Sequence, residues 1–406
     1  MRASFCLLTL SLGLSSAAPP GLTLGEPVVV AESPPEERRW GYYQFPHIER
    51  AAGGRLAVTF HVHADAAESY GLKADVPNRA VSGDGGRTWT LETGPQAASG
   101  VLLPNGDRLR IVTPRPFPVN ELKLPAPLDV KKGTYSKEEY TLYRLRELPS
   151  PLDRIWLSRL PKGSPAWQQE QSRLEDPVAL RYSLRGLFPI VWWGDLVVPR
   201  DRSVIAGVYP GYLEGQPGYP WNIFFYRSTD SGRSWKVQGR ILYQPDPQAD
   251  PMAARRDGFS EPATAILANG TIFCVMRSTD GNGVGPMYQS RSEDLGRTWT
   301  RPRAFTPTGV LPRLLRLGNG ALLLSSGRPG VDVRVSLDGS GRNWTTPQSL
   351  VPITSEKVNA DSCGYTGMVA LDDHSALIAY SWFRRKGTDG HERKTIMVRR
   401  IEVKVK

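Results

Sequence analysis

The 406-residue sequence contains only three cysteines, and no stretch of it is long and uncharged enough to cross a bilayer. Cys6 lies in the apolar N-terminal run, so only Cys274 and Cys363 remain for the rest of the chain. Two cysteines are too few for a disulfide-stapled scaffold. We therefore expect a protein without a membrane span whose fold is held by an ordinary hydrophobic core.

Signatures of nucleic-acid-binding proteins are also missing, although the formal net charge is +11. The sequence has no basic run and no RNA-binding motif. A positive charge of this size suits an anionic partner, such as an acidic glycan, but it also suits nucleic acid or simple solubility. The sequence therefore predicts a glycan partner and no nucleic acid.

The N-terminus has the composition of a secretory signal. Arg2 precedes a mostly apolar run over residues 5–14, which is followed by small residues from Ser15 to Ala18. This pattern predicts a signal peptide over residues 1–18. The mature chain, residues 19–406, is expected to be secreted to a periplasmic or extracellular location.

A hairpin motif, Ser-x-Asp-x-Gly-x-x-Trp, is repeated along the chain. Three complete copies begin at Ser82, Ser228 and Ser292, and a copy with one extra residue begins at Ser336. In such a motif the carboxylate can accept hydrogen bonds from turn N–H groups, glycine permits a positive φ, and tryptophan packs between strands. We therefore assign these aspartates a structural role and not a catalytic one.

A second repeated element, an apolar strand, a turn and another apolar strand, lies upstream of each hairpin. Six copies occur, over residues 45–60, 100–113, 189–208, 262–276, 311–325 and 365–380. Repetition at this period predicts an all-β fold, a six-bladed β-propeller in one domain over residues 19–406. We expect the early strand 28–31 to join the terminal segment 395–405, and the Pro- and Lys-rich segment 114–151 to be an inserted loop.

The repeats can be aligned on their first turn without any other sequence. Pro46, Pro262 and Pro312 each lie eight residues before a turn glycine. Residues just before this proline should point to the mouth of the central channel, where propellers bind ligands. Glu261 occupies such a position, and Tyr365 shares it in the sixth repeat. A carboxylate that accepts the proton of an attacking phenol is one interpretation of this pair. The alternative is that Glu261 pairs with a nearby arginine and Tyr365 caps the core.

Over nearly its whole mature length, and most closely over residues 259–380, the chain resembles the retaining exo-sialidases of the Asp-box superfamily. The resemblance implies Tyr365 as the nucleophile, Glu261 as its proton acceptor, and Arg277 with Arg328 as a clamp for the substrate carboxylate. Such enzymes use a tyrosine because the reacting carbon bears a carboxylate, which repels an anionic nucleophile. The implied substrate is a terminal sialic acid or a related acidic sugar.

The sequence departs from the family pattern at the first arginine, where Gln44 stands in the segment Tyr43-Gln44-Phe45-Pro46. An amide carries no charge, so either the substrate differs there or another cation, such as Arg313, replaces the missing one. By resemblance, the acid/base residue comes from the loop after the first inner strands. Asp65 is our candidate, with Glu68 and Asp75 as alternatives.

Aromatic and histidine residues complete the candidate site. Trp193, together with Trp192 and Trp221, could stack on sugar faces, although core packing is the alternative for at least one of them. His61 and His63 fall on one face of a strand, where a metal site or a catalytic histidine is conceivable. Only two ligands are visible, so we predict no metal and no cofactor.

Three functions remain open from the sequence. The first is a secreted exo-glycosidase of sialidase type. The second is a propeller glycosidase or lyase that acts on another glycan, which Gln44 and the two histidines favour. The third is a non-catalytic propeller that binds glycans, since a fold does not determine a function.

Overall fold

The computed structural model describes residues 21–92, 100–133, 138–279 and 285–405, and the predicted signal peptide lies outside them. The described part is almost entirely β-structure and contains no α-helix. None of its helical segments is long and apolar enough to cross a membrane. Its only helices are short 3-10 turns: η1 (Ala52–Gly54), η2 (Ala67–Ser69), η3 (Val119–Glu121), η4 (Leu145–Glu147) and η5 (Ala253–Arg255).

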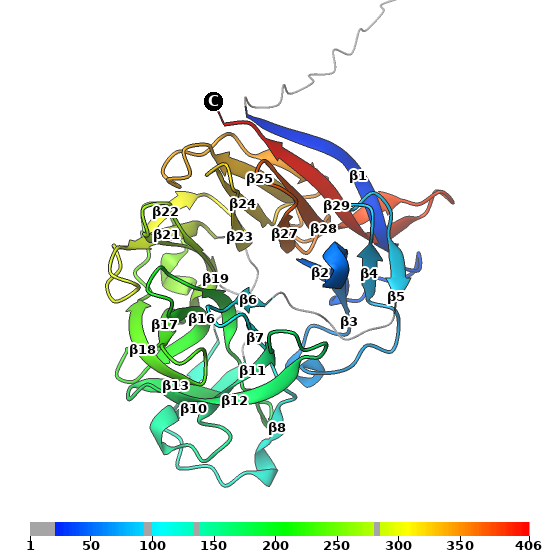
Figure 1. The fold of residues 1–406 in the computed structure, drawn as a ribbon. Helices are drawn as coiled ribbons and strands as arrows, with labels where there is room; N and C mark the ends of the chain where they lie inside the picture. Colours follow the sequence, from blue (N-terminus) through cyan, green and yellow to red (C-terminus); the bar gives the residue numbers. More distant parts are fainter. Residues whose placement is uncertain (1–20, 93–99, 134–137, 280–284, 406) are drawn as a thin grey trace, which may run out of the picture.

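Four sheets have four strands each, and in three of them the strands follow one another in chain order. These three sheets are arranged around the middle of the molecule with their first strands innermost (Figure 1). Their strands are β2 (Tyr42–Arg50), β3 (Leu56–Val62), β4 (Arg79–Ser82) and β5 (Thr90–Glu92); β19 (Gly258–Ile266), β20 (Ile272–Thr279), β21 (Met287–Ser292) and β22 (Arg303–Thr306); β23 (Val310–Arg316), β24 (Leu322–Gly327), β25 (Val331–Ser336) and β26 (Gln348–Val351).

The fourth sheet joins the two ends of the chain. Its order is β1-β29-β28-β27, with β1 (Leu22–Glu32), β27 (Thr366–Ala370), β28 (Ser375–Lys386) and β29 (Glu392–Val403). The antiparallel pairing of β1 with β29 runs from Leu22 opposite Val403 to Glu32 opposite Thr395 (Figure 1). This pairing confirms the prediction that the early strand joins the terminal segment.

The remaining strands form one sheet of 13 strands. Two groups of four in it, β6-β7-β11-β12 and β15-β16-β17-β18, are linked by parallel pairing of β12 with β18. The strands of these groups are β6 (Val101–Leu102), β7 (Arg108–Ile111), β11 (Arg154–Leu160), β12 (Gln168–Glu175), β15 (Trp193–Val197), β16 (Val204–Leu213), β17 (Asn222–Ser228) and β18 (Ser234–Ile241).

The inserted segment 114–151 is not the irregular loop that the composition predicted. It contributes β8 (Phe117–Pro118), β9 (Asp129–Lys132) and β10 (Glu139–Arg144), which extend the large sheet through β13 (Ala179–Leu184) and β14 (Leu187–Phe188). Leu142 packs with Tyr182 and Tyr212 in a hydrophobic cluster of its own. Burial of these apolar side chains stabilises the segment. The proline and lysine content of the segment gave no sign of them.

The repeated motif forms a hydrogen-bonded turn. Ser82 Oγ donates to Asp84 Oδ1 at 2.8 Å, and the same oxygen accepts the backbone N–H groups of Arg87 and Thr88 at 2.9 and 3.0 Å. Trp89 Nε1 donates to the carbonyl oxygen of Gly86 at 3.1 Å. These carboxylates are engaged in the turn, as a structural role requires.

The register derived from the three prolines is visible in the backbone. Phe45, Glu261 and Leu311, each just before one of these prolines, have φ values of 52°, 51° and 35°. At each of them the pairing of the two inner strands shifts. Positive φ is unfavourable for residues with a Cβ, and three equivalent instances indicate that the fold imposes this turn to direct side chains inward.

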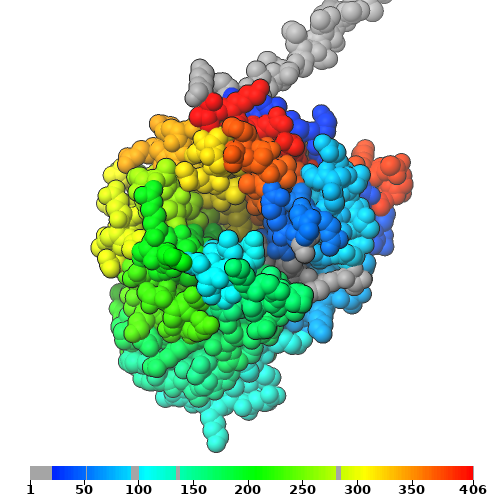
Figure 2. Space-filling model, in the orientation of Figure 1, coloured from blue at the N-terminus to red at the C-terminus, as the bar shows by residue number. Residues whose placement is uncertain are grey.

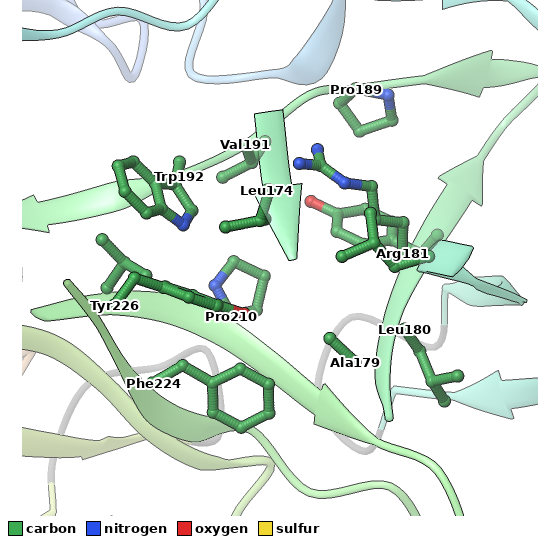
Figure 3. A pocket seen from close by; sticks show the side chains of 13 residues that line it. Leu174, Ala179, Leu180, Arg181, Pro189, Val191, Trp192, Pro210, Phe224 and Tyr226 are labelled. Atoms are coloured by element: carbon green, nitrogen blue, oxygen red, sulfur yellow. The ribbon is translucent and has the colours of Figure 1, made fainter. Parts of the chain in front are cut away.

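A small cavity of about 40 Å³ is lined by residues of β12, β13, β16 and β17, where Arg181 extends among apolar side chains (Figure 3). Arg181 Nη2 donates to the carbonyl oxygen of Arg154 at 2.8 Å. This volume is far below the roughly 300–1,000 Å³ of small-molecule sites.

Candidate active site

A larger cavity of about 550 Å³ lies at the centre of the molecule, where the innermost strands converge. Figure 2 shows one face of the molecule hollowed at its middle, between the blue N-terminal segments and the green-to-orange segments. A volume of this size is typical of ligand sites. Eight of the candidate residues named from the sequence line it: Asp65, Trp192, Trp193, Trp221, Glu261, Arg277, Arg313 and Tyr365.

Tyr365 and Glu261 are in direct contact. The Tyr365 hydroxyl donates to Glu261 Oε1, which also accepts Arg277 Nη1 at 2.8 Å. The other oxygen, Oε2, accepts the backbone N–H of Leu311 at 2.7 Å. Both interpretations of Glu261 are therefore realised at once, because it pairs with an arginine and also accepts the phenolic hydrogen bond.

The surroundings keep the proton on the phenol. Burial opposes the charge on Glu261, but Arg277, the hydrogen bond from Tyr365 and Arg328 outweigh it and lower the pKa of Glu261. Burial, followed by the negative charge of Glu261, holds the pKa of Tyr365 well above its ordinary value. At neutral pH the pair is a neutral phenol beside an ionised carboxylate.

Arg328 lies behind this pair and does not line the cavity. Its Nε donates to the carbonyl oxygen of Cys363 at 2.9 Å. Its guanidinium carbon is 5.1 Å from the ring centre of Trp40 and 5.7 Å from that of Tyr365. The predicted clamp residue thus lies against two aromatic rings, of which that of Tyr365 lines the cavity.

Arg313 also lines the cavity. Its Nη1 is 3.3 Å from Asp195 Oδ1, and its Nε donates to the carbonyl oxygen of Thr366 at 3.4 Å. A second cavity of about 420 Å³ shares His47 and Arg313 with the first. Arg313 is therefore a cation that is already paired, at the junction of two cavities.

The side chain of Gln44 does not lie in the cavity, where we predicted it. Its side chain is fully buried, it does not line the cavity, and neither of its amide atoms has a hydrogen-bond partner within the described residues. The neighbouring Phe45 lines the cavity instead. At the equivalent place in the other sheet both Ser260, which corresponds to Gln44, and Glu261 line the cavity.

His61 occupies in the first sheet the place that Arg277 has in its own. Gln44 is opposite His61 in the strand pairing, as Ser260 is opposite Arg277. The Nδ1 atom of His61 is 3.0 Å from the carbonyl oxygen of Gly41, and burial lowers the pKa of this histidine. Across the described ranges, no group of three or more His, Cys, Asp or Glu side chains could hold a metal ion.

Among the three acid/base candidates, the cavity contains only Asp65. Trp40 Nε1 donates to Asp65 Oδ2 at 2.9 Å. Glu68 is in the loop nearby, where it lies 3.8 Å from Arg185, and neither it nor Asp75 lines the cavity.

Aromatic rings form one wall of the cavity. The ring centres of Tyr70 and Trp193 are 5.5 Å apart, those of Trp193 and Tyr209 are 5.5 Å apart, and those of Tyr209 and Trp221 are 6.3 Å apart. Trp192, in contrast, is almost fully buried and packs on Trp235. Trp193 and Trp221 are thus available to a ligand, whereas Trp192 belongs mainly to the core.

Three residues of the site were not found from the sequence: Trp40, Tyr70 and Tyr209. Phe45 was placed at the channel mouth by the proline register, and it lines the cavity. Trp40, Tyr70 and Tyr209 belong to no repeated motif, and only their contacts in the fold place them at the site.

Comparisons with known proteins agree on the fold. The chain is similar to a protein of unknown function from Dyadobacter fermentans (TM-score 0.62, 18% identity, covering 95% of this chain and 100% of that one). It is also similar to an α-L-arabinanase from Penicillium chrysogenum (0.53, 16%, 93% and 98%) and to a mutant of the NanB sialidase from Streptococcus pneumoniae (0.50, 12%, 93% and 70%). No family model matches the sequence, and no curated protein matches it.

These structures place the chain among the propeller-like folds that sialidases and arabinanases share. At identities below 20% they establish the fold alone. The chemistry must be argued from the site.

Proposed function

We propose that this protein is a secreted exo-glycosidase of sialidase type, which releases a terminal sialic acid or a related acidic sugar from glycans. The observation that carries the proposal is the hydrogen bond from the buried Tyr365 hydroxyl to the ionised Glu261. A carboxylate that only stabilised the fold would need its arginine but not a phenol inside a cavity of ligand size.

The proposed architecture is a six-bladed propeller of the Asp-box superfamily in one domain over residues 19–406. The four separate sheets supply four blades, and β6-β7-β11-β12 and β15-β16-β17-β18 supply two more within the large sheet. The conserved hydrogen-bonding pattern of the turns at Ser82, Ser228 and Ser292 supports this assignment.

In the proposed first step, Tyr365 Oη attacks the anomeric carbon while its proton passes to Glu261. Asp65 gives its proton to the glycosidic oxygen, and the bond to the leaving sugar breaks. In the second step Asp65 takes a proton from a water molecule that attacks the same carbon. The bond to Tyr365 breaks, and Glu261 returns the proton to the phenolic oxygen.

The neutral phenol suits a substrate with a carboxylate on the reacting carbon. Arg277 is open to the cavity on the side of Glu261 and is the cation best placed for that carboxylate. The aromatic wall with Trp193 suits the apolar face of the leaving sugar.

A second candidate, a glycosidase for a neutral sugar, is favoured by Gln44, which supplies no charge to the cavity. A substrate screen of the secreted protein separates the two. Aryl sialosides, aryl arabinosides and other neutral aryl glycosides would be compared by release of the aryl group, with the Tyr365→Phe variant as the control. Turnover of sialosides that depends on Tyr365 supports the proposal, and turnover of neutral glycosides alone overturns it.

A further inference from the structure

Trp40 connects two residues to which the proposed mechanism gives separate roles. It lies in the segment between β1 and β2, with a half-buried side chain. Its Nε1 donates to Asp65 Oδ2 at 2.9 Å, and its ring lies 5.1 Å from the guanidinium carbon of Arg328. It also packs edge-on against Phe45 with 6.1 Å between ring centres, and Phe45 lines the cavity.

The ring of Trp40 limits what Arg328 can bind. The guanidinium lies near two aromatic rings, those of Trp40 and Tyr365, and its Nε is used by Cys363. Arg328 is only 7% exposed. A carboxylate in the cavity therefore meets Arg277 but cannot form a paired contact with Arg328 while the indole stays in place.

The N–H of the same indole fixes Asp65. Asp65 follows β3 in a loop, where a short carboxylate side chain has several rotamers. The hydrogen bond from Trp40 favours one of them, in which Asp65 lines the cavity.

We propose that Trp40 is a positioning and specificity residue, which holds Asp65 for proton transfer and covers Arg328, so that a substrate carboxylate is recognised by one arginine and not two. The proposal rests on the proposed function in assigning proton transfer to Asp65. The cover over Arg328 stands independently of it.

Two substitutions separate the two roles. Trp40→Phe keeps an aromatic ring over Arg328 but removes the donor to Asp65. Trp40→Ala removes both and uncovers the guanidinium. Because Trp40 is half-buried at the surface of the site, both variants should fold, and thermal unfolding checks this.

Binding is measured first, by calorimetry with the 2,3-unsaturated derivative of sialic acid and with its uncharged methyl ester. For Trp40→Ala we expect at least fivefold tighter binding of the acid than in the wild type, with no gain for the ester. Trp40→Phe should bind both as the wild type does. Equal or weaker binding of the acid by Trp40→Ala overturns the cover over Arg328.

Kinetics then test the role at Asp65 with the substrate found in the screen. For Trp40→Phe we expect kcat to fall at least tenfold with little change in KM, because Asp65 without its donor is no longer held in one rotamer. An unchanged kcat overturns the positioning role. Tight binding of the acid by Trp40→Ala in a protein that turns over no sialoside supports the cover and counts against the proposed function, so the two failures are distinguishable.

Discussion

The Tyr365 hydroxyl and the Arg277 guanidinium donate to the same oxygen of Glu261. This sharing means that Glu261 cannot lose its proton acceptor role without also leaving Arg277 unpaired in a buried place, where it is 4% exposed. The proposed catalytic function of Glu261 and its structural function are therefore coupled, and substitutions must be chosen to separate them.

Tyr365→Phe is the cleaner test of the proposed chemistry. It removes the proposed nucleophile and one hydrogen bond but leaves the ion pair of Glu261 with Arg277. We expect kcat to fall by several orders of magnitude with little change in the midpoint of thermal unfolding. Glu261→Gln should lower kcat as severely and also lower the unfolding temperature, because it leaves a buried charge unpaired. Near wild-type turnover in Tyr365→Phe would show that the tyrosine is not the nucleophile.

Much of this arrangement was predicted from the sequence, for a physical reason. The turn motif and the proline register are local, since each depends on residues a few positions apart, and they located Glu261 and Tyr365 at one level of the fold. The environment of Arg328 was not predictable, because Trp40 and Cys363 belong to other parts of the chain. Of the two residues before Pro46, the family resemblance pointed to Gln44, but Phe45 is the one that lines the cavity.

The turn tryptophans should differ in their contribution to stability. Trp235 is fully buried, at 0% exposure, and packs against Trp192 with 5.1 Å between ring centres. Trp235→Ala should lower the free energy of unfolding by about 3–5 kcal/mol. Trp299 is only partly buried, although it stacks on Phe225 at 4.0 Å. Trp299→Ala should therefore lower the free energy of unfolding by less than Trp235→Ala does. Chemical denaturation of both variants measures the two free energies.

The stability of the protein should fall in mild acid because of His47. Burial, followed by the charges of Arg313 and Arg110, lowers the pKa of His47 to about 4. An unfolded histidine has a pKa of about 6.5, so between these values the unfolded chain binds a proton that the folded chain does not. The free energy of unfolding therefore decreases as the pH falls from about 6.5 to about 4.

The variant His47→Gln isolates this effect. It cannot titrate, so its unfolding temperature should decline less than that of the wild type between pH 7 and pH 4.5. Thermal scans across this range give both curves. Parallel curves would show that His47 is protonated as easily in the folded protein as in the unfolded chain.

Gln44 provides the last test, because the structure and the family resemblance give it different roles. Its buried amide has no hydrogen-bond partner within the described part of the chain, and burying an amide in this way costs about 1–3 kcal/mol. Gln44→Met has a similar shape and no such cost, so it should be as stable as the wild type or more stable, with kcat/KM within about threefold. A severe loss of kcat/KM in this variant would show that the amide does contact the substrate. Gln44→Arg should instead lower the unfolding temperature, since a guanidinium would be buried there without an acceptor. If that variant is stable and gains tenfold or more in kcat/KM on an aryl sialoside, the new arginine reaches the substrate carboxylate, and the position is a vacant arginine site after all.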